Sequence, residues 1–188
     1  NVTIDPEGEA ITTNTFGPPA DYAVGTGTFV VITEDLDGDG DLDVFHTGDV
    51  RQLFVTLFSN SAQEFQQQLL PLSPTGIRDV AQGDVNGDGS PDIILSALNQ
   101  REGSRLFLND GNGLFTLTDQ LFGRSDGVEL VDVDGDRDLD AVLVASEGGR
   151  VWFNDGVGNF TQSPEVMPTD GKDGVHSGDF DNDGDVDL

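Results

Sequence analysis

The 188-residue sequence contains no cysteine, which excludes disulfide bonds and thiolate metal sites. It has only eight Lys and Arg residues against 36 Asp and Glu, and its formal net charge is -28 at pH 7. Because the few basic residues are scattered singly, nucleic acid and anionic membrane surfaces are poor partners. No apolar run is long enough to span a bilayer, so we also expect no membrane insertion.

Groups suited to catalysis are scarce as well. His46 and His176 are the only histidines, Lys172 is the only lysine, and no Ser, His and acid form a recognisable triad motif. We expect a surface role for His46. His176 is expected in a first strand, either near the central channel or packed between blades. A pair of carboxylates for glycoside chemistry stays open because acids are so numerous. The sequence therefore predicts a protein that is not an enzyme.

What the sequence does contain is a nine-residue acidic segment that recurs four times. The segments read DLDGDGDLD, DVNGDGSPD, DVDGDRDLD and DFDNDGDVD, and they begin at Asp35, Asp84, Asp132 and Asp179. Successive starts lie 47 to 49 residues apart. A period that runs through the chain in this way indicates a repeat architecture.

Each segment offers side-chain oxygens at positions one, three, five and nine, and a backbone carbonyl at position seven. Calcium takes about six to eight oxygen ligands, and alternate residues of a short loop can turn that many oxygens inward. We therefore predict about four calcium ions. The predicted ligands are Asp35, Asp37, Asp39, Asp41 and Asp43; Asp84, Asn86, Asp88, Ser90 and Asp92; Asp132, Asp134, Asp136, Asp138 and Asp140; and Asp179, Asp181, Asp183, Asp185 and Asp187.

Two other loop positions are restricted to a few residue types. Position four holds residues that tolerate a left-handed backbone, namely Gly38, Gly87, Gly135 and Asn182. Position two is apolar, and we expect its side chain to point away from the ion. These residues are Leu36, Val85, Val133 and Phe180.

An EF-hand begins with similar spacing, but it needs a Glu at position twelve and a helix on each side. Position twelve is His46, Leu95 or Leu143 in the first three loops. Strand-like runs follow the loops, as at residues 92–95 and 141–144. These features exclude an EF-hand and a dockerin-like pair. Solvated acidic turns without metal are the remaining alternative, and the Asp shared at position nine argues against them.

The rest of each repeat consists of strands and turns. A valine lies four residues before each loop, at Val31, Val80, Val128 and Val175. Third strands are predicted at residues 53–58, 105–108 and 150–153, and Asn-Asp-Gly turns follow at residues 109–111 and 154–156. A fourth strand is marked by Phe16, Phe65, Phe115 or Phe160. Four strands in about 48 residues predict one blade of an all-β propeller.

The Asn-Asp-Gly turn, the Phe that follows it and the nine-residue Asp loop together resemble FG-GAP and VCBS repeats. These repeats form the calcium-loop blades of integrin alpha-subunit propellers and of many secreted bacterial proteins. Residues 16–20, Phe-Gly-Pro-Pro-Ala, approximate the motif that names the family. The resemblance implies that each loop joins the first two strands of a blade, that seven blades are usual, and that cell adhesion is a common role.

The sequence predicts one repeat domain, 1–188. Its units are residues 1–26 with 175–188, then 27–74, 75–123 and 124–174. We expect a ring of about four blades that closes by pairing of N- and C-terminal strands. The alternatives are a fragment of a seven-bladed propeller and an assembly of several chains, which would make the protein a homo-oligomer.

The predicted function is a calcium-stabilised binding or adhesion scaffold, extracellular or at the cell surface, with a periplasmic location also open. Its partner would be a protein or a glycan. One alternative is a carbohydrate-binding lectin, and another is a non-catalytic part of a larger secreted polysaccharide-degrading enzyme. For a glycan contact, the candidate aromatic residues are Tyr22 and Trp152, although Trp152 is also expected to pack in the third strand.

Overall fold

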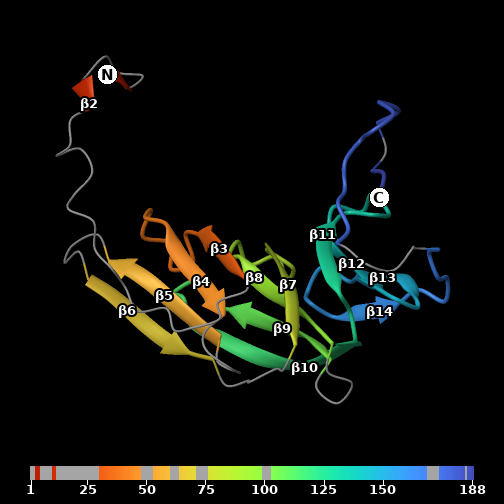
Figure 1. The fold of residues 1–188 in the computed structure, drawn as a ribbon, viewed down its shortest axis with the longest axis horizontal. Coiled ribbons are helices and arrows are strands. Elements are labelled where there is room, and N and C mark those ends of the chain that lie inside the picture. Colours follow the sequence, from red (N-terminus) through yellow and green to blue (C-terminus); the bar gives the residue numbers. More distant parts are fainter. Residues whose placement is uncertain are drawn as a thin grey trace.

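The computed structural model describes residues 3–4, 10–11, 30–47, 53–59, 64–70, 76–98, 103–168, 174–184 and 186–188. Regular secondary structure in these residues consists of strands (Figure 1). None of these residues belongs to a helix of the length and apolar character that a membrane crossing requires. The all-β prediction is therefore confirmed.

Twelve of the strands form three antiparallel sheets of four strands, each in chain order from the first strand to the fourth. These sheets are the predicted blades. The first comprises β3 (Val31–Glu34), β4 (Asp43–Thr47), β5 (Leu53–Ser59) and β6 (Glu64–Leu69). The second comprises β7 (Ile77–Gly83), β8 (Asp92–Ala97), β9 (Ser104–Asn109) and β10 (Phe115–Gly123). The third comprises β11 (Gly127–Val131), β12 (Asp140–Ala145), β13 (Gly148–Asn154) and β14 (Phe160–Gln162).

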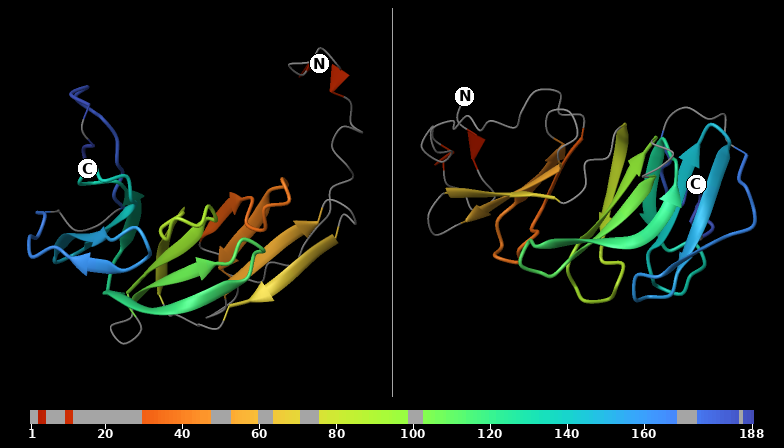
Figure 2. Two further views of the ribbon diagram at one scale, coloured as in Figure 1. Left: turned by 180° about the vertical axis from the view of Figure 1, so that it is seen from behind. Right: turned by 90° about the horizontal axis from the view of Figure 1, so that it is seen from below.

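The blades lie side by side in an arc (Figures 1 and 2). Their first strands β3, β7 and β11 lie toward the concave side, and their fourth strands lie toward the convex side (Figure 1). Neighbouring blades are joined by hydrogen bonds between first strands: Gln82 Nε2 donates to Glu34 Oε2 at 2.7 Å, and the Val128 amide donates to Asp79 Oδ2 at 3.2 Å. This stacking of blades along an arc is the arrangement found in a β-propeller.

The hydrophobic core lies between blades rather than within one. Every residue of β8 and of β12 is buried, and both strands contribute to the apolar clusters between blades. One core cluster joins the first two blades through Leu36, Phe45, Leu70, Ile93, Leu95, Phe107 and Phe115. Another cluster joins the second and third blades through residues such as Val85, Ile94, Leu106, Val128, Leu143 and Phe160. Since burying a large apolar side chain contributes about 1.5–3 kcal/mol, each blade depends on its neighbour for stability.

His46 does not have the surface role that the sequence suggested. Its exposed fraction is 1%, and it lies on β4 within the core. Position twelve of the next two repeats holds Leu95 and Leu143, which are also buried on their second strands. The same repeat position therefore faces the interior in all three blades, and the histidine in the first blade takes the place of a core leucine.

The predicted closure of the ring is wrong, because the sheets are not closed. In the described residues β1 (Thr3–Ile4) pairs only with β2 (Ala10–Ile11), and the last unit forms one isolated bridge between Gly178 and Asp187. The two ends lie on opposite sides of the arc (Figures 1 and 2).

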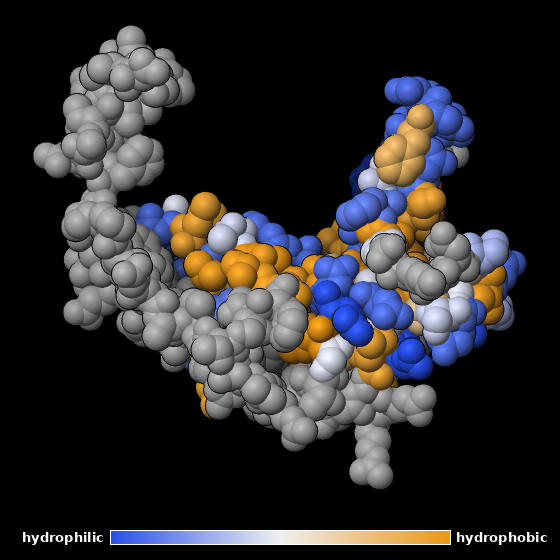
Figure 3. All heavy atoms as spheres, in the orientation of Figure 1, coloured by the Kyte–Doolittle hydropathy of each residue, from blue (hydrophilic) through white to orange (hydrophobic). Residues whose placement is uncertain are grey.

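The described parts of the two ends form little sheet. Strands of two residues and a single bridge provide too few backbone hydrogen bonds to hold a blade together. The arm that carries the C-terminus is mostly hydrophilic on the face seen in Figure 3, although Phe180, Val186 and Leu188 are exposed apolar residues of this segment. The division into units, the seven-bladed fragment and the multi-chain assembly stay predictions. Tyr22 and most of residues 1–26 lie outside the described residues.

Candidate metal centre

Three of the acidic loops join the first and second strands of their blades. They connect β3 to β4, β7 to β8 and β11 to β12, which is the placement that the resemblance implied. The fourth loop is enclosed by a bridge instead: the Gly178 amide donates to the Asp187 carbonyl at 3.1 Å, and the Asp187 amide donates back at 2.8 Å. All four loops are thus fixed at both ends by backbone hydrogen bonds.

Inside each loop the carboxylates turn inward and accept hydrogen bonds from the loop's own backbone. The position-one carboxylate accepts from the amide at position six. These bonds link Gly40 to Asp35 (3.1 Å), Gly89 to Asp84 (2.8 Å), Arg137 to Asp132 (3.0 Å) and Gly184 to Asp179 (3.2 Å). The side chain at position three likewise accepts from the amide at position five in every loop, at 2.9–3.2 Å. Four segments of different sequence therefore adopt one conformation.

The left-handed backbone predicted for position four is confirmed in every loop. The φ angles are 74° at Gly38, 77° at Gly87, 81° at Gly135 and 62° at Asn182. Position six is left-handed too, which sequence reasoning missed: its φ is 81° at Arg137, where the other three loops have glycine. An arginine in this region is strained, so the third loop carries a local cost at position six that glycine avoids in the other three.

The carboxylates converge closely enough to share one cation. In three loops the acidic side chains offer ligand atoms that all lie within 4.8 Å of one another, and the groups are Asp35, Asp37 and Asp39; Asp132, Asp134 and Asp136; and Asp179, Asp181 and Asp187. The second loop has Asn86 in place of a carboxylate, and the Oδ1 of Asn86 accepts from the Asp88 amide at 2.9 Å. Aspartate 185 lies outside the described residues.

The first loop supplies an independent test of whether these residues fit a calcium ion. Asp35 Oδ1 and Asp41 Oδ2 are buried and accept no hydrogen bond from the described residues. A buried carboxylate oxygen without a partner is costly, and a bound hard cation would satisfy it. The donor set contains only oxygen, which suits calcium better than a thiolate- or imidazole-seeking metal. Asp41 was predicted to contribute its backbone carbonyl. The structure also buries one of its side-chain oxygens, Oδ2.

The aspartate at position nine closes the loop in addition to any role as a ligand. Asp43, Asp92 and Asp140 are fully buried. In each loop this carboxylate accepts from the amide at position two, at 2.9 Å from Leu36, 3.1 Å from Val85, 3.0 Å from Val133 and 2.9 Å from Phe180. The bond joins residues seven apart, so the Asp shared at position nine also has a structural explanation. Its role as a ligand stays a prediction.

The apolar residue at position two packs as predicted only where a following blade covers it. Leu36 and Val85 each have an exposed fraction of 1%, and they belong to the clusters between the first two blades and between the second and third. Phe180 in the fourth loop is 68% exposed. The difference follows from packing. The third and fourth strands of the next blade cover Leu36 and Val85, whereas none of the described residues covers Phe180 in that way.

Asn109 and Asn154 hold the loops of adjacent blades together, which sequence reasoning missed. Each is the first residue of an Asn-Asp-Gly turn, and each is buried. Asn109 Nδ2 donates to the Leu36 carbonyl in the preceding blade at 2.8 Å. Asn154 Nδ2 donates to the Val85 carbonyl at 2.7 Å. These bonds tie position two of one loop to the following blade.

The same asparagines also hold the loop of their own blade. Asn109 Nδ2 donates to the Pro91 carbonyl at 3.2 Å, and its backbone amide donates to Asp92 Oδ1 at 2.8 Å. Asn154 repeats this arrangement, with Nδ2 3.1 Å from the Leu139 carbonyl and the amide 2.9 Å from Asp140 Oδ1. Each asparagine thus connects two consecutive loops. The recurrence of Asn two residues after the third-strand aromatic was the available signal.

The glycine of the turn lies between two loops. A Cβ on Gly156 would collide with the Asp138 carboxylate of its own blade, and its carbonyl lies within 3.4 Å of where a Cβ would stand on Gly87 in the preceding blade. Gly156 also has a φ of 76°. Glycine suits this position because it has no Cβ and adopts a positive φ without strain. Its presence lets the turn of one blade pack closely against the acidic loops of two blades.

The buried and crowded carboxylates hold protons more tightly than usual. Burial raises the pKa of Asp92 to about 6, against the hydrogen bonds from the amides of Asn109 and Val85. Burial also raises the pKa values of Asp37, Asp138 and Asp140, with further contributions from neighbouring carboxylates. The pKa of Asp88, by contrast, is lowered, chiefly by the Ser90 amide. The loops are therefore electrostatically strained at neutral pH without a cation.

We predict that the metal-free protein is more stable at pH 5 than at pH 7.5. The pKa of Asp92 is about 6 in the folded state and 3.8 in the reference state, so between these values folding takes up a proton and stability falls as pH rises. The raised pKa of Asp140 acts in the same direction. The lowered pKa of Asp88 has its effect only below 3.8, outside this interval. Thermal melts after passage over a chelating resin measure the difference.

Calcium should reverse this dependence, because it binds the deprotonated carboxylates and competes with protons. The rise in the melting midpoint on adding calcium should be larger at pH 7.5 than at pH 5. Asp92→Asn removes one titrating group and should reduce the pH dependence of the metal-free form. A metal-free protein whose melting midpoint is lower at pH 5 than at pH 7.5 would contradict the electrostatic argument.

The comparisons with known proteins support the repeat and the fold. The FG-GAP-like repeat matches three overlapping segments, residues 35–95, 84–143 and 132–188. Among solved structures, an Agrocybe aegerita lectin described as recognising non-reducing terminal N-acetylglucosamine is 23% identical with a TM-score of 0.52. The match covers 73% of this chain and 38% of that one, and at this identity it shows likeness of fold. No curated protein matches.

The matched segments extend from the first acidic loop to the last residue. Each begins at one loop, continues through the second, third and fourth strands of that blade and includes the next loop, so the family repeat has the same spacing as the blades. The chain therefore belongs to the family of FG-GAP-like repeat proteins.

Proposed function

We propose that the protein is a calcium-stabilised extracellular β-propeller scaffold that binds a protein or glycan partner and has no catalysis of its own. The observation that carries the calcium assignment is a pair of buried carboxylate oxygens, on Asp35 and Asp41, that have no hydrogen-bond partner among the described residues. They lie in a loop whose conformation recurs in all four repeats. The FG-GAP-like repeats and the lectin-like fold support a binding scaffold.

The calcium affinity expected of such loops supports the proposed extracellular location. The position-five residues Asp39, Asp88, Asp136 and Asp183 are exposed to solvent. Exposed carboxylates interact weakly with a cation because water screens them. Extracellular calcium modules have dissociation constants of about 0.1–1 mM, which suit the calcium level outside cells. A scaffold of this kind would be stabilised where it is secreted, and a role in adhesion would fit its family.

Calcium stoichiometry tests the proposal directly. Equilibrium dialysis should give about four ions per chain, and the double variant Asp132→Asn, Asp134→Asn should bind about one ion fewer because it removes two carboxylates from one cluster. Asp119→Asn is the matched control, because Asp119 is exposed on β10 away from the loops. Identical calcium stoichiometry in the double variant and the control would mean that the third loop does not bind calcium.

Glycan binding is the second candidate function, favoured by the likeness to the Agrocybe aegerita lectin. A glycan array would separate it from protein binding, since a lectin should select related glycans in calcium and a protein-binding scaffold should select none. The third candidate, a non-catalytic part of a larger secreted polysaccharide-degrading enzyme, would be supported by a catalytic domain encoded in the same gene.

A further inference from the structure

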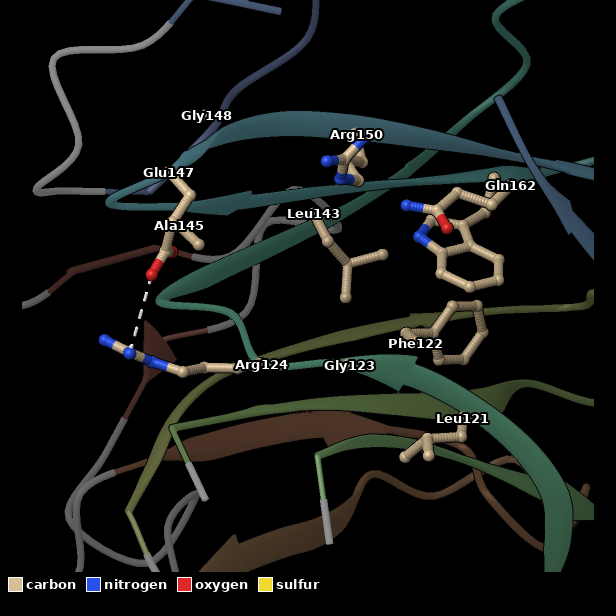
Figure 4. Close-up of a pocket in the computed structure, with 11 residues that line it drawn as sticks. Leu121, Phe122, Gly123, Arg124, Leu143, Ala145, Glu147, Gly148, Arg150 and Gln162 are labelled. Atoms are coloured by element: carbon tan, nitrogen blue, oxygen red, sulfur yellow. Dashed lines mark ion pairs between the residues drawn. The ribbon is translucent and has the colours of Figure 1, made fainter. Parts of the chain in front are cut away.

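A cleft of about 390 Å³ opens between the second and third blades, between β10 on one side and β12, β13 and β14 on the other. Arg124 and Glu147 lie at one end of it, and Phe122 and Gln162 lie at the other (Figure 4). Its volume falls within the range of about 300–1,000 Å³ that is usual for small-molecule sites. The cleft is separate from the acidic loops described above.

The cleft has an apolar wall that includes two aromatic rings. Phe122 and Trp152 line it and meet edge to face, with ring centroids 5.2 Å apart and an interplanar angle of 77°. Leu121 and Leu143 extend the wall. Trp152 packs against the core from the third strand of its blade, as predicted, while also lining the cleft. Such a wall can pack against the apolar face of a flat ligand.

The polar groups of the cleft are mostly hydrogen-bond donors. The chain has only eight basic residues, and two of them, Arg124 and Arg150, line this one cleft. Arg124 lies 3.6 Å from Glu147, whereas the Arg150 guanidinium makes no ion pair with any described residue. Within the same part of the chain, Trp152 Nε1 also lacks a hydrogen-bond partner. In a protein with 36 acidic residues, an arginine without a carboxylate partner in a cleft indicates a ligand that brings one.

We propose that this cleft binds a sugar residue that carries a carboxylate, of the hexuronate type; this inference rests on the glycan-binding candidate above. The carboxylate pairs with Arg150, whose planar fork matches its geometry. The ring face packs on Trp152 and Phe122. Hydroxyl groups bond to Gln162 and to Glu147, the one acidic side chain among the cleft residues. A neutral sugar would leave Arg150 without an anionic partner.

Calorimetric titration of the calcium-loaded protein with D-glucuronate, D-glucose and acetate tests the ligand class. D-glucuronate should bind at least about tenfold more tightly than D-glucose, which lacks the carboxylate, and than acetate, which lacks the ring. The expected ratio follows because hydrogen bonds to charged groups contribute enough to change affinity by about ten- to a hundredfold. Equal affinity for D-glucuronate and D-glucose would overturn the assignment.

Arg150→Gln should weaken D-glucuronate binding about tenfold or more while leaving D-glucose binding within about twofold. Arg78→Gln is the matched control, because it removes the same charge from an exposed position on β7 outside the cleft. It should leave D-glucuronate affinity within about twofold. Equal losses in the two variants would mean that net charge alone attracts the ligand, which would overturn the site.

Thermal melts of the same samples separate this inference from the calcium proposal. Absence of D-glucuronate binding in a protein whose melting still depends on calcium would overturn the cleft assignment alone. Binding that depends on Arg150 in a protein whose melting ignores calcium would support the cleft and count against the calcium proposal instead.

Discussion

Removing divalent ions should lower the thermal midpoint of the protein by roughly 10–20 °C at pH 7.5. With a dissociation constant of about 0.1 mM and about 1 mM free calcium, each site contributes about 1.4 kcal/mol, so four sites contribute about 6 kcal/mol. Each 1 kcal/mol moves the midpoint of a domain of this size by about 2–4 °C. The loss is large because net stability is only about 5–15 kcal/mol.

The experiment compares melts in 1 mM calcium, in chelator, and in chelator followed by excess calcium or magnesium. Calcium should restore the midpoint, whereas magnesium should restore little, because it demands a tighter octahedral site and gives up its water reluctantly. A thermal midpoint that does not change on chelation would contradict the calcium proposal. Light scattering on the same samples reports the solution mass, which distinguishes a monomer from an assembly of several chains.

The local features of the loops were predictable because their interactions join residues two to seven positions apart. Asp35 accepts from Gly40 five residues later, and Asp43 accepts from Leu36 seven residues earlier. A pattern of alternate Asp residues with Gly at position four therefore specifies this loop geometry within nine residues. Four copies then confirm one another, since a chance match would not repeat at equal intervals.

Interactions between blades were not predictable in the same way. The Asn109 bond to the Leu36 carbonyl spans 73 residues, and the Asn154 bond to the Val85 carbonyl spans 69. The recurrence of Asn after the third-strand aromatic marks these positions as special, but nothing near them in the sequence indicates which distant carbonyl accepts the bond. The burial of His46 was missed for a related reason: its polarity suggested the surface, although aligning it with Leu95 and Leu143 would have placed it in the core.

The closure of the ring was wrong because it depended on counting residues at the chain ends rather than on packing. A repeat period predicts where the next unit begins, but it does not supply a strand edge to pair with. Phe180 shows the consequence, since its counterparts Leu36 and Val85 are buried by a following blade while it is 68% exposed. Blade number is thus determined by contacts between blades, which the repeat pattern leaves unspecified.

Replacing Asn154 with alanine should destabilise the calcium-loaded protein by about 3 kcal/mol, which is at the upper end of the usual range for one substitution. The change leaves the Val85 and Leu139 carbonyls without their donor, and an unsatisfied buried polar group costs about 1–3 kcal/mol. Asn159→Ala is the control on the same turn, because Asn159 is exposed and, among the residues that the structure describes, its side chain bonds only Asp155 Oδ2, at 2.9 Å. It should cost about 1 kcal/mol or less. Urea unfolding in calcium measures both changes.

The neighbouring interface provides an independent repeat of this experiment. Asn109→Ala should match Asn154→Ala, because Asn109 donates to the Leu36 and Pro91 carbonyls in the same way, and exposed Asn112 is its control. Since each buried asparagine touches two loops, its loss should also weaken calcium binding at both, so the two buried variants should lose more of the calcium-induced midpoint rise than the controls. Equal effects of the buried and exposed substitutions would mean that the apolar clusters alone hold the blades together, and that the loops bind their ions independently of one another.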